Sequence, residues 1–491
     1  MNEHEGLASL SGLARVPTGV PGLDAVTDGG FLAGDAYLVI GAPGTGKTTL
    51  GNQLAFAHAA RGGAVLFATL LTETHERMLA HLSGFRFVDP ELVGERVRYL
   101  SVLQALEEAG LDGVLEALRR GVREHGAGLL VVDGTVAAEE LVGSGFDYGR
   151  FVQGLQARLA LLGCTTVLLS SGRTEEAGAL GTHVDGVVEL SLEGVEARDI
   201  RWLRIAKLRG SAYLGGRHRF VIDERGIAVY PRIEAALAGV VPTHPTPSER
   251  VGIGVAGLDA MLDGGLLTGS STVVMGTPGA GKTILALHFL AEGARRGESG
   301  VIASFHETAP LLAATADAVG LGLGRHVESG AVRVMWQAPL EGSPDAWAWD
   351  LLRLVDDVRP RRLVVDALSD LNRLFAVPQR QVAFVQALAN ELRTRGITAL
   401  FNLEIDSFAS QELVAPIPSV SAAFDNGILL RTGELRSRVE RLVSVLKTRQ
   451  SGFDPTIRRC TIGEHGIVLG EPFGEVAGLL TGDVRPGPGT S

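Results

Sequence analysis

Apolar runs and helical periodicities alternate along the chain, and the alternation occurs twice. The first half contains unbroken apolar runs of strand length, at residues 37–40, 65–71, 97–100, 129–132 and 166–170. Segments with helical spacing lie between these runs, at residues 49–60, 73–82, 111–125 and 148–162. Strands that are apolar throughout and separated by helices are typical of parallel sheets covered on both faces. The pattern therefore predicts an α/β fold in each half.

Each half ends differently from how it begins. Shorter stretches of alternating apolar and polar residues follow the last helix of the first half, at residues 186–192, 200–207 and 219–222. Alternation of this kind is typical of half-buried strands. We therefore expect two tandem domains, each a mostly parallel sheet flanked by helices, with an antiparallel C-terminal extension.

The two halves also share sequence. Residues 16–50 and 251–285 align without a gap and are identical at 20 of 35 positions. Because the repeat is a whole domain long, it indicates a tandem duplication and not a solenoid. The predicted domains span residues 1–237 and 250–473. Between them we expect a linker at 238–249, where prolines recur, and after them a loose Gly- and Pro-rich tail at 474–491.

A glycine-rich loop follows the first apolar run of each half. Both copies read G-x-x-x-x-G-K-T, at residues 41–48 and 276–283, and both precede a helical segment. In a strand–loop–helix context this pattern is a phosphate-binding P-loop, whereas an ordinary glycine-rich turn would not need that context. The residues predicted to contact a nucleotide are Gly41, Ala42, Pro43, Gly44, Thr45, Gly46, Lys47, Thr48 and Thr49, and Gly276, Thr277, Pro278, Gly279, Ala280, Gly281, Lys282, Thr283 and Ile284.

A P-loop enzyme also needs a carboxylate near its Mg²⁺ ion. Asp133 and Asp366 each end an apolar run, 86 residues after Lys47 and 84 residues after Lys282. Such an aspartate could simply cap the next turn, but its recurrence at similar spacing favours a metal site. The predicted metal ligands are Thr48, Asp133, Thr283 and Asp366.

Hydrolysis further requires a group that orients or deprotonates water. Glu73 and Glu307 follow the second apolar run of their halves, and Glu76 and His306 are nearby alternatives. An acidic residue at a helix start is also favoured by the helix dipole alone. We assign the catalytic role to Glu73 and Glu307, together with the phosphate-binding Lys47 and Lys282.

Two basic segments of the form K-x-R lie near the ends of the halves. They contain Lys207 and Arg209 in the first half, and Lys447 and Arg449 in the second. On a strand, both side chains of each pair would point to one face. Residue type alone favours a solvated edge strand that discourages aggregation, and the recurrence of the pair in both halves shifts this only modestly.

Composition and net charge bear on which partners and which cellular compartment the protein is expected to have. The chain has 491 residues, 45% of them hydrophobic, with a net charge of −11, which argues against a nucleic-acid or anionic-membrane surface. Its two cysteines form no disulfide framework, and no leader or apolar run of membrane-spanning length is evident. A cytoplasmic protein is expected.

Taken in order, the motifs resemble the KaiC-like branch of the RecA-type ATPases over nearly the whole chain. The resemblance rests on T-G-V-x-G-L-D at 18–24, the two P-loops, the strand-end aspartates, the basic segments at 207–211 and 447–451, and the endings at 220–227 and 460–467. It implies two stacked RecA-like rings in a homohexamer, with ATP at subunit interfaces. It also implies that Lys207, Arg209, Lys447 and Arg449 reach the ATP held by a neighbouring subunit.

The chain departs from that family in three places, one of them the second-half lead-in at 252–254, which lacks the threonine found at Thr18. The family's paired catalytic glutamates are Thr72-Glu73 and His306-Glu307 here, and its adjacent phosphorylation sites are Ser421-Ala422. Slow hydrolysis and the loss of a two-site phosphorylation cycle are therefore expected. A regulatory Mg-ATPase with a signalling protein partner is the leading hypothesis. The alternatives are a serine/threonine autokinase acting on Ser421 or elsewhere, a non-catalytic ATP-gated scaffold, and a DNA-dependent recombinase.

Overall fold

Two compact units make up the protein, Met1–Ala236 and Leu237–Ser491, and each is described by itself. The computed structural model describes residues 14–70, 75–134, 145–172, 178–195, 197–238, 249–338, 342–405, 423–435, 438–449, 451–473, 476–477 and 485–486. Most of the predicted linker and tail lie outside these ranges, so their boundaries stay predictions.

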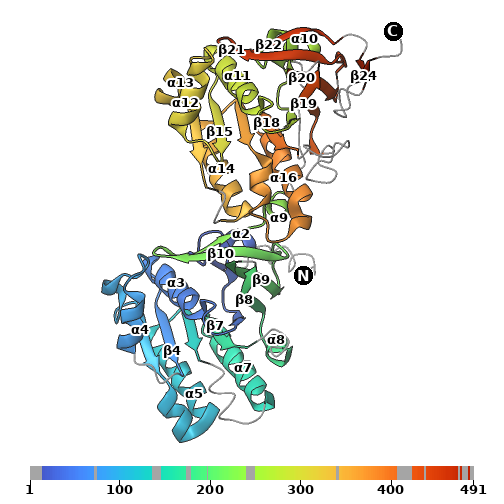
Figure 1. The fold of residues 1–491 in the computed structure, drawn as a ribbon. Helices are drawn as coiled ribbons and strands as arrows, with labels where there is room; N and C mark the ends of the chain where they lie inside the picture. The colour runs from blue at the N-terminus through green and yellow to red at the C-terminus, as the bar shows by residue number, and fades with distance from the viewer. Residues whose placement is uncertain are drawn as a thin grey trace, which may run out of the picture. The chain divides into compact units, whose positions relative to one another are not determined.

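The first unit is built on a nine-stranded sheet (Figure 1). Its strands are β3 (Ala36–Gly41), β4 (Val65–Thr69), β5 (Val97–Ser101), β6 (Leu129–Asp133), β7 (Thr165–Ser171), β8 (Gly186–Val195), β9 (Arg198–Leu208), β10 (Arg217–Asp223) and β11 (Gly226–Tyr230). They lie in the order β11-β10-β9-β8-β3-β7-β6-β4-β5. The P-loop strand β3 is therefore central.

The mode of strand pairing changes once across this sheet, from parallel to antiparallel. The strands from β5 to β8 are parallel, and β8, β9, β10 and β11 pair antiparallel. The predicted α/β fold with an antiparallel C-terminal extension is thus confirmed. One detail is wrong. Residues 186–192 were expected in the antiparallel extension, but they form β8, which pairs in parallel with β3. The antiparallel extension begins where β9 pairs with β8.

Helices cover both faces of the first sheet. On one face, α3 (Lys47–Ala60) and α4 (His75–Leu82) pack with the alternate strand residues Val39, Phe67 and Val131. On the other face, α5 (Leu103–His125) and α7 (Gly145–Ala160) pack on the remaining strand residues. The α5 segment starts earlier than expected because a kink at Gly110, whose φ is 61°, joins a further turn to the predicted helix at 111–125. The shorter elements are β1 (Arg15–Val16), α2 (Leu23–Val26), β2 (Phe31–Leu32), η1 (Pro90–Leu92), α8 (Gly178–His183) and α9 (Ile233–Ala236).

The second unit repeats this architecture. Its strands are β14 (Ser271–Gly276), β15 (Gly300–Ser304), β16 (Val332–Trp336), β17 (Arg362–Asp366), β18 (Thr398–Glu404), β19 (Asn426–Leu435), β20 (Arg438–Lys447), β21 (Arg458–Gly463) and β22 (Gly466–Pro472). The order β16-β15-β17-β18-β14-β19-β20-β21-β22 places β14 where β3 lies in the first sheet. Two nine-stranded, mostly parallel sheets therefore result from the duplication.

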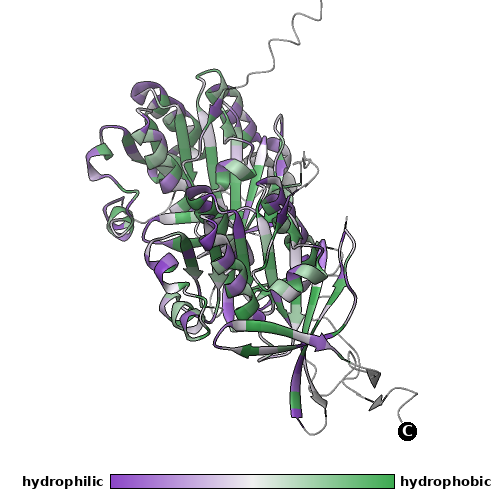
Figure 2. Ribbon diagram, turned by 90° about the horizontal axis from the view of Figure 1, so that it is seen from above, coloured by the Kyte–Doolittle hydropathy of each residue, from purple (hydrophilic) through white to green (hydrophobic). Residues whose placement is uncertain are grey.

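The helices of the second unit also form two layers. One layer contains α10 (Ala256–Met261), α11 (Lys282–Arg295), α12 (Ala309–Ala318) and α13 (Gly324–Glu328), whose apolar side chains share one core. In the other, α14 (Pro344–Val358) contacts β15 and α16 (Gln381–Thr394) contacts β18. The strands are mostly hydrophobic and the helices carry hydrophilic outer faces (Figure 2). The remaining elements are β12 (Arg250–Val251), β13 (Leu266–Leu267), α15 (Leu368–Asn372), η2 (Pro378–Arg380), β23 (Val476–Ala477) and β24 (Arg485–Pro486).

Strand order fixes where each candidate site lies. The strand that ends in Asp133 or Asp366 is separated from the P-loop strand by a single strand, β7 or β18. Parallel strands end at the same edge of a sheet, so the loop, the aspartate and the end of the intervening strand meet there. Within the described part of the chain, no helix is long and apolar enough to cross a membrane.

Candidate functional site

Each P-loop curls tightly between its strand and its helix. Gly44 and Gly46 have φ values of 79° and 106°, and Gly279 and Gly281 have 73° and 107°. L-residues with a Cβ rarely adopt these angles. At the strand end, a Cβ on Gly276 would lie 2.4 Å from the carbonyl oxygen of Leu430. The glycines of the motif are therefore required by the local backbone.

The P-loop lysines lie under their loops. Lys47 Nζ donates hydrogen bonds to the carbonyl oxygens of Gly41 (2.8 Å) and Ala42 (2.9 Å). Lys282 Nζ donates to those of Gly276 and Thr277, both at 2.9 Å. Burial lowers the pKa of both lysines. Since an ammonium has three donors, each lysine keeps one for an anion in the loop.

A hydroxyl and a carboxylate meet beside each loop. Thr48 Oγ1 donates to Asp133 Oδ2 at 2.7 Å, and Thr283 Oγ1 donates to Asp366 Oδ2 at 2.8 Å. Among the described residues, no cluster of three or more His, Cys, Asp or Glu side chains could hold a metal ion. A hydroxyl and one carboxylate nonetheless fit Mg²⁺, which prefers oxygen ligands and takes its remaining ligands from water and substrate phosphates.

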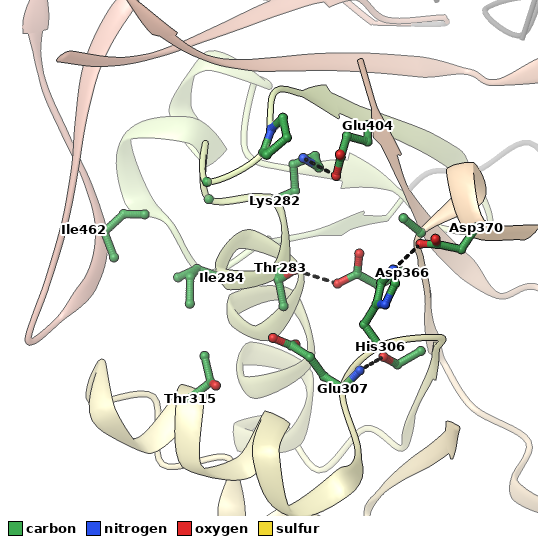
Figure 3. A pocket seen from close by; sticks show the side chains of 15 residues that line it. Lys282, Thr283, Ile284, His306, Glu307, Thr315, Asp366, Asp370, Glu404 and Ile462 are labelled. Atoms are coloured by element: carbon green, nitrogen blue, oxygen red, sulfur yellow. Dashed lines mark hydrogen bonds and ion pairs between the residues drawn. The ribbon is translucent and has the colours of Figure 1, made fainter. Parts of the chain in front are cut away.

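In the second unit these groups border a cavity of about 410 Å³ (Figure 3). It lies at the carboxyl ends of β14, β15, β17 and β18. Its lining combines P-loop residues with residues from five other segments: Pro278, Gly279, Gly281, Lys282, Thr283, Ile284, Ser304, His306, Glu307, Thr315, Asp366, Ala367, Asp370, Glu404 and Ile462. The predicted phosphate, metal and catalytic residues of this half are thus brought together.

Glu307 reaches into this cavity from the segment after β15. Its backbone N–H donates to Ser304 Oγ at 3.0 Å, which fixes the turn that presents it (Figure 3). Its Oε2 atom is buried without a hydrogen-bond partner among the described residues. Burial, with the nearby Asp366 charge, raises the pKa of the Glu307 carboxyl. A desolvated carboxylate of raised pKa is suited to accept a proton.

The alternative residues lie less favourably. His306 is 64% exposed, and its Nε2 lies 2.9 Å from Asp370 Oδ2. Glu76 is exposed in the first turn of α4. Glu73 and Ser421 lie outside the described residues, so the first catalytic candidate and the candidate phosphorylation site stay predictions.

The basic segments are remote from the P-loop of their own unit. Lys207 Nζ donates to the carbonyls of Gly181 (2.7 Å) and Val184 (2.5 Å), and Arg209 lies 3.7 Å from Asp185. Asp185 in turn accepts a hydrogen bond from the N–H of Ala36, where β3 begins, whereas the P-loop follows the end of β3.

The second basic segment repeats this placement. Arg449 lies 3.9 Å from Asp425, which accepts from the N–H of Ser271 at the start of β14. Neither pair can therefore contact a phosphate bound in its own loop.

Among the lining residues of the second site that the sequence did not predict, two lie against the P-loop. Glu404 ends β18 and lies 3.8 Å from Lys282 Nζ, and Ile462 of β21 packs on the P-loop, since a Cβ on Gly281 would lie 2.9 Å from it. A polar residue ending an apolar run was visible at 404. Its place beside the P-loop follows only from strand order, which the sequence pattern did not supply.

Comparison of the sequence with known proteins identifies similar proteins over nearly the whole chain. The family model described as "ATPase: KaiC" matches residues 16–234 and 251–473. The chain is 27% identical to the circadian clock oscillator protein KaiC of Picosynechococcus sp., covering 96% of this chain and 93% of that protein. It is 27% identical to KaiC of Rippkaea orientalis, over 96% and 92% of the two chains, and 25% identical to the circadian clock protein KaiC3 of Synechocystis sp., over 96% and 94%.

Proposed function

Because the chain belongs to the KaiC family of ATPases, we propose that it binds Mg-ATP at both P-loops and hydrolyses it there. One observation carries the proposal: each unit sets a P-loop lysine beside a threonine–aspartate pair, Thr48–Asp133 and Thr283–Asp366. Oxygen ligands for a hard cation therefore lie beside a loop built for phosphate in both units.

Binding uses groups that the fold already holds in position. The backbone N–H groups at the start of α3 and α11 point at the loop, and the helix dipole adds partial positive charge there. The free donor of Lys47 or Lys282 reaches the β- and γ-phosphates. Thr48 with Asp133, and Thr283 with Asp366, would hold Mg²⁺, which would neutralise charge on the phosphate oxygens.

Hydrolysis at the second site proceeds by proton transfer to Glu307. The oxygen of a water molecule forms a bond to the γ-phosphorus while the bond from that phosphorus to the bridging oxygen of ADP breaks. The water proton passes to the Glu307 carboxylate, whose raised pKa favours accepting it. Glu73 has this role at the first site by position in the sequence.

We further propose that the active species is a ring, a homohexamer with ATP at its subunit interfaces. The placement of the basic segments supports this, because Lys207, Arg209, Lys447 and Arg449 lie at the opposite end of their P-loop strands. They can stabilise transition-state charge only on ATP held by another subunit, as an arginine finger does.

We propose a regulatory role for this turnover. ATP binding and hydrolysis change the conformation of the ring, and a protein partner binds according to the nucleotide state. The relatives named above are circadian clock proteins, which is consistent with a signalling ATPase. We place it in the cytoplasm, since Cys164 and Cys460 are both buried free thiols in different units. The net charge of −11 disfavours the DNA-dependent alternative.

Equilibrium binding of Mg-ATP to the full chain tests the proposal. Wild type should bind at two sites per chain, and Lys47→Ala and Lys282→Ala should each weaken one of them. Unchanged affinity in both variants would contradict the proposal. Phosphopeptide mass spectrometry after incubation distinguishes the kinase alternative, because a kinase leaves phosphate on a serine or threonine. Bound ATP that never turns over would indicate the scaffold.

A further inference from the structure

The two candidate sites differ at one position directly beside the P-loop lysine. Glu404 ends β18 and pairs in register with Gly276, the last residue of β14. Its Oε2 lies 3.8 Å from Lys282 Nζ, across the mouth of the loop (Figure 3). The carboxylate is 43% exposed, so it is held by this charge contact and not by burial.

The first unit has no carboxylate in this place. Ser171 ends β7 and pairs in register with Gly41, as Glu404 does with Gly276. Lys47 makes the same two bonds to loop carbonyls as Lys282. The duplicated sites therefore share their phosphate loop and their threonine–aspartate pair, and differ by one negative charge facing the lysine.

Glu404 competes for the donor that a phosphate needs. Two donors of Lys282 are occupied by Gly276 and Thr277, and the charge contact with Glu404 is made by the same ammonium. Asp366, whose charge also acts on Lys282, lines the same cavity together with Asp370 and Glu307. An incoming polyphosphate must displace Glu404 from Lys282, and repulsion grows with each charge that it brings near.

Glu404 competes for Lys282 mainly with the terminal phosphate of ATP. The lysine of a P-loop lies between the β- and γ-phosphates, so ADP leaves the γ side of Lys282 open to Glu404 and ATP does not. We propose that Glu404 is a specificity-determining residue that weakens ATP relative to ADP at the second site, whereas Ser171 leaves the first site without this discrimination. The inference rests on the proposed function, that both loops bind Mg-nucleotide.

The experiment measures dissociation constants of Mg-ATP and Mg-ADP for the full chain. Lys47→Ala is present throughout, so that the second site is observed. Glu404→Ser and Glu404→Gln should tighten ATP binding about two- to fivefold, the size expected for a half-exposed ion pair. ADP binding should change much less, so the ratio of the two constants shifts. Glu328→Gln, which removes an exposed carboxylate away from the cavity lining, should leave the ratio unchanged.

A reciprocal variant guards against a purely structural effect. Ser171→Glu in a Lys282→Ala background should weaken ATP relative to ADP at the first site by a similar factor. An unchanged ATP-to-ADP ratio in both Glu404 variants, with nucleotide still bound, would overturn the inference alone. No nucleotide binding by the wild-type chain would instead overturn the proposed function on which it rests.

Discussion

Ile467 of β22 donates its backbone N–H to Nε2 of His288 at 2.8 Å, which ties the P-loop helix α11 to the last strand of its sheet. In the first unit Gln53 makes the equivalent contact, accepting from the N–H of Ile227 at 2.7 Å and donating to its carbonyl. A side chain that does not titrate and one that does therefore perform the same task in the two units.

This difference predicts pH-dependent stability in the second unit. His288 accepts through Nε2 only when neutral, and burial lowers its pKa below the ordinary value of 6.5. Because the unfolded chain then binds the proton more readily, stability is full above about pH 6.5 and declines below it, by at most about 1.4 kcal/mol per pH unit.

Denaturation of wild type and His288→Gln at pH 7.5 and pH 5.5 tests this. Tryptophan fluorescence suits the measurement because three of the four tryptophans, Trp336, Trp347 and Trp349, lie in the second unit. Both proteins carry Trp202→Phe, which removes the tryptophan of the first unit. The stability lost on acidification should be smaller in His288→Gln. An equal loss in both proteins would show that His288 does not titrate as described.

The P-loop strand should tolerate no side chain at its last residue. A Cβ on Gly276 would lie 2.4 Å from the backbone oxygen of Leu430, so Gly276→Ala forces the sheet apart. We expect a loss of about 1–3 kcal/mol in unfolding free energy and weakened ATP binding. Gly433→Ala, where a Cβ meets nothing within 4 Å, is the control in the adjacent strand. Equal stability of the two variants would contradict the packing argument.

Removing a metal-site carboxylate should raise the demand for Mg²⁺. Asp366→Asn keeps the shape of the side chain but replaces a charged ligand oxygen beside Thr283. We expect the Mg²⁺ concentration for half-maximal ATP turnover at the second site to rise about 10- to 100-fold, with Asp133→Asn acting likewise at the first. A magnesium titration of ADP release measures this, and an unchanged midpoint in both variants would exclude these aspartates as ligands.

Glu307 should affect turnover more than binding. Glu307→Gln removes the proton acceptor while keeping side-chain volume, so single-turnover hydrolysis at the second site should fall about 10²- to 10⁴-fold. ATP affinity should change little, because the carboxylate is not a phosphate ligand. If His306→Ala lowered the rate as strongly and Glu307→Gln did not, the exposed histidine would take the catalytic role.

Features set by neighbouring residues in the sequence were predicted correctly, whereas features set by contacts between distant parts of the chain were not. The P-loops and the strand-end aspartates are local sequence patterns. The apolar runs that alternate with helical segments correctly predicted the α/β fold with its antiparallel extension. Strand neighbours are set by tertiary pairing, so the parallel pairing of β8 with β3 was assigned wrongly. For the same reason Glu404 was not recognised as a neighbour of Lys282, since 122 residues separate them. The halves look alike in sequence, yet their chemical difference lies at positions that only the sheet brings together.

The most direct test of the account is ADP release from purified wild type with Mg-ATP, compared with Lys47→Ala, Lys282→Ala and the double variant. The account predicts turnover in wild type, a reduced rate in each single variant, and none in the double variant. Turnover that persists in the double variant, or its absence in a wild type that still binds ATP, would contradict the claim that both P-loops hydrolyse ATP.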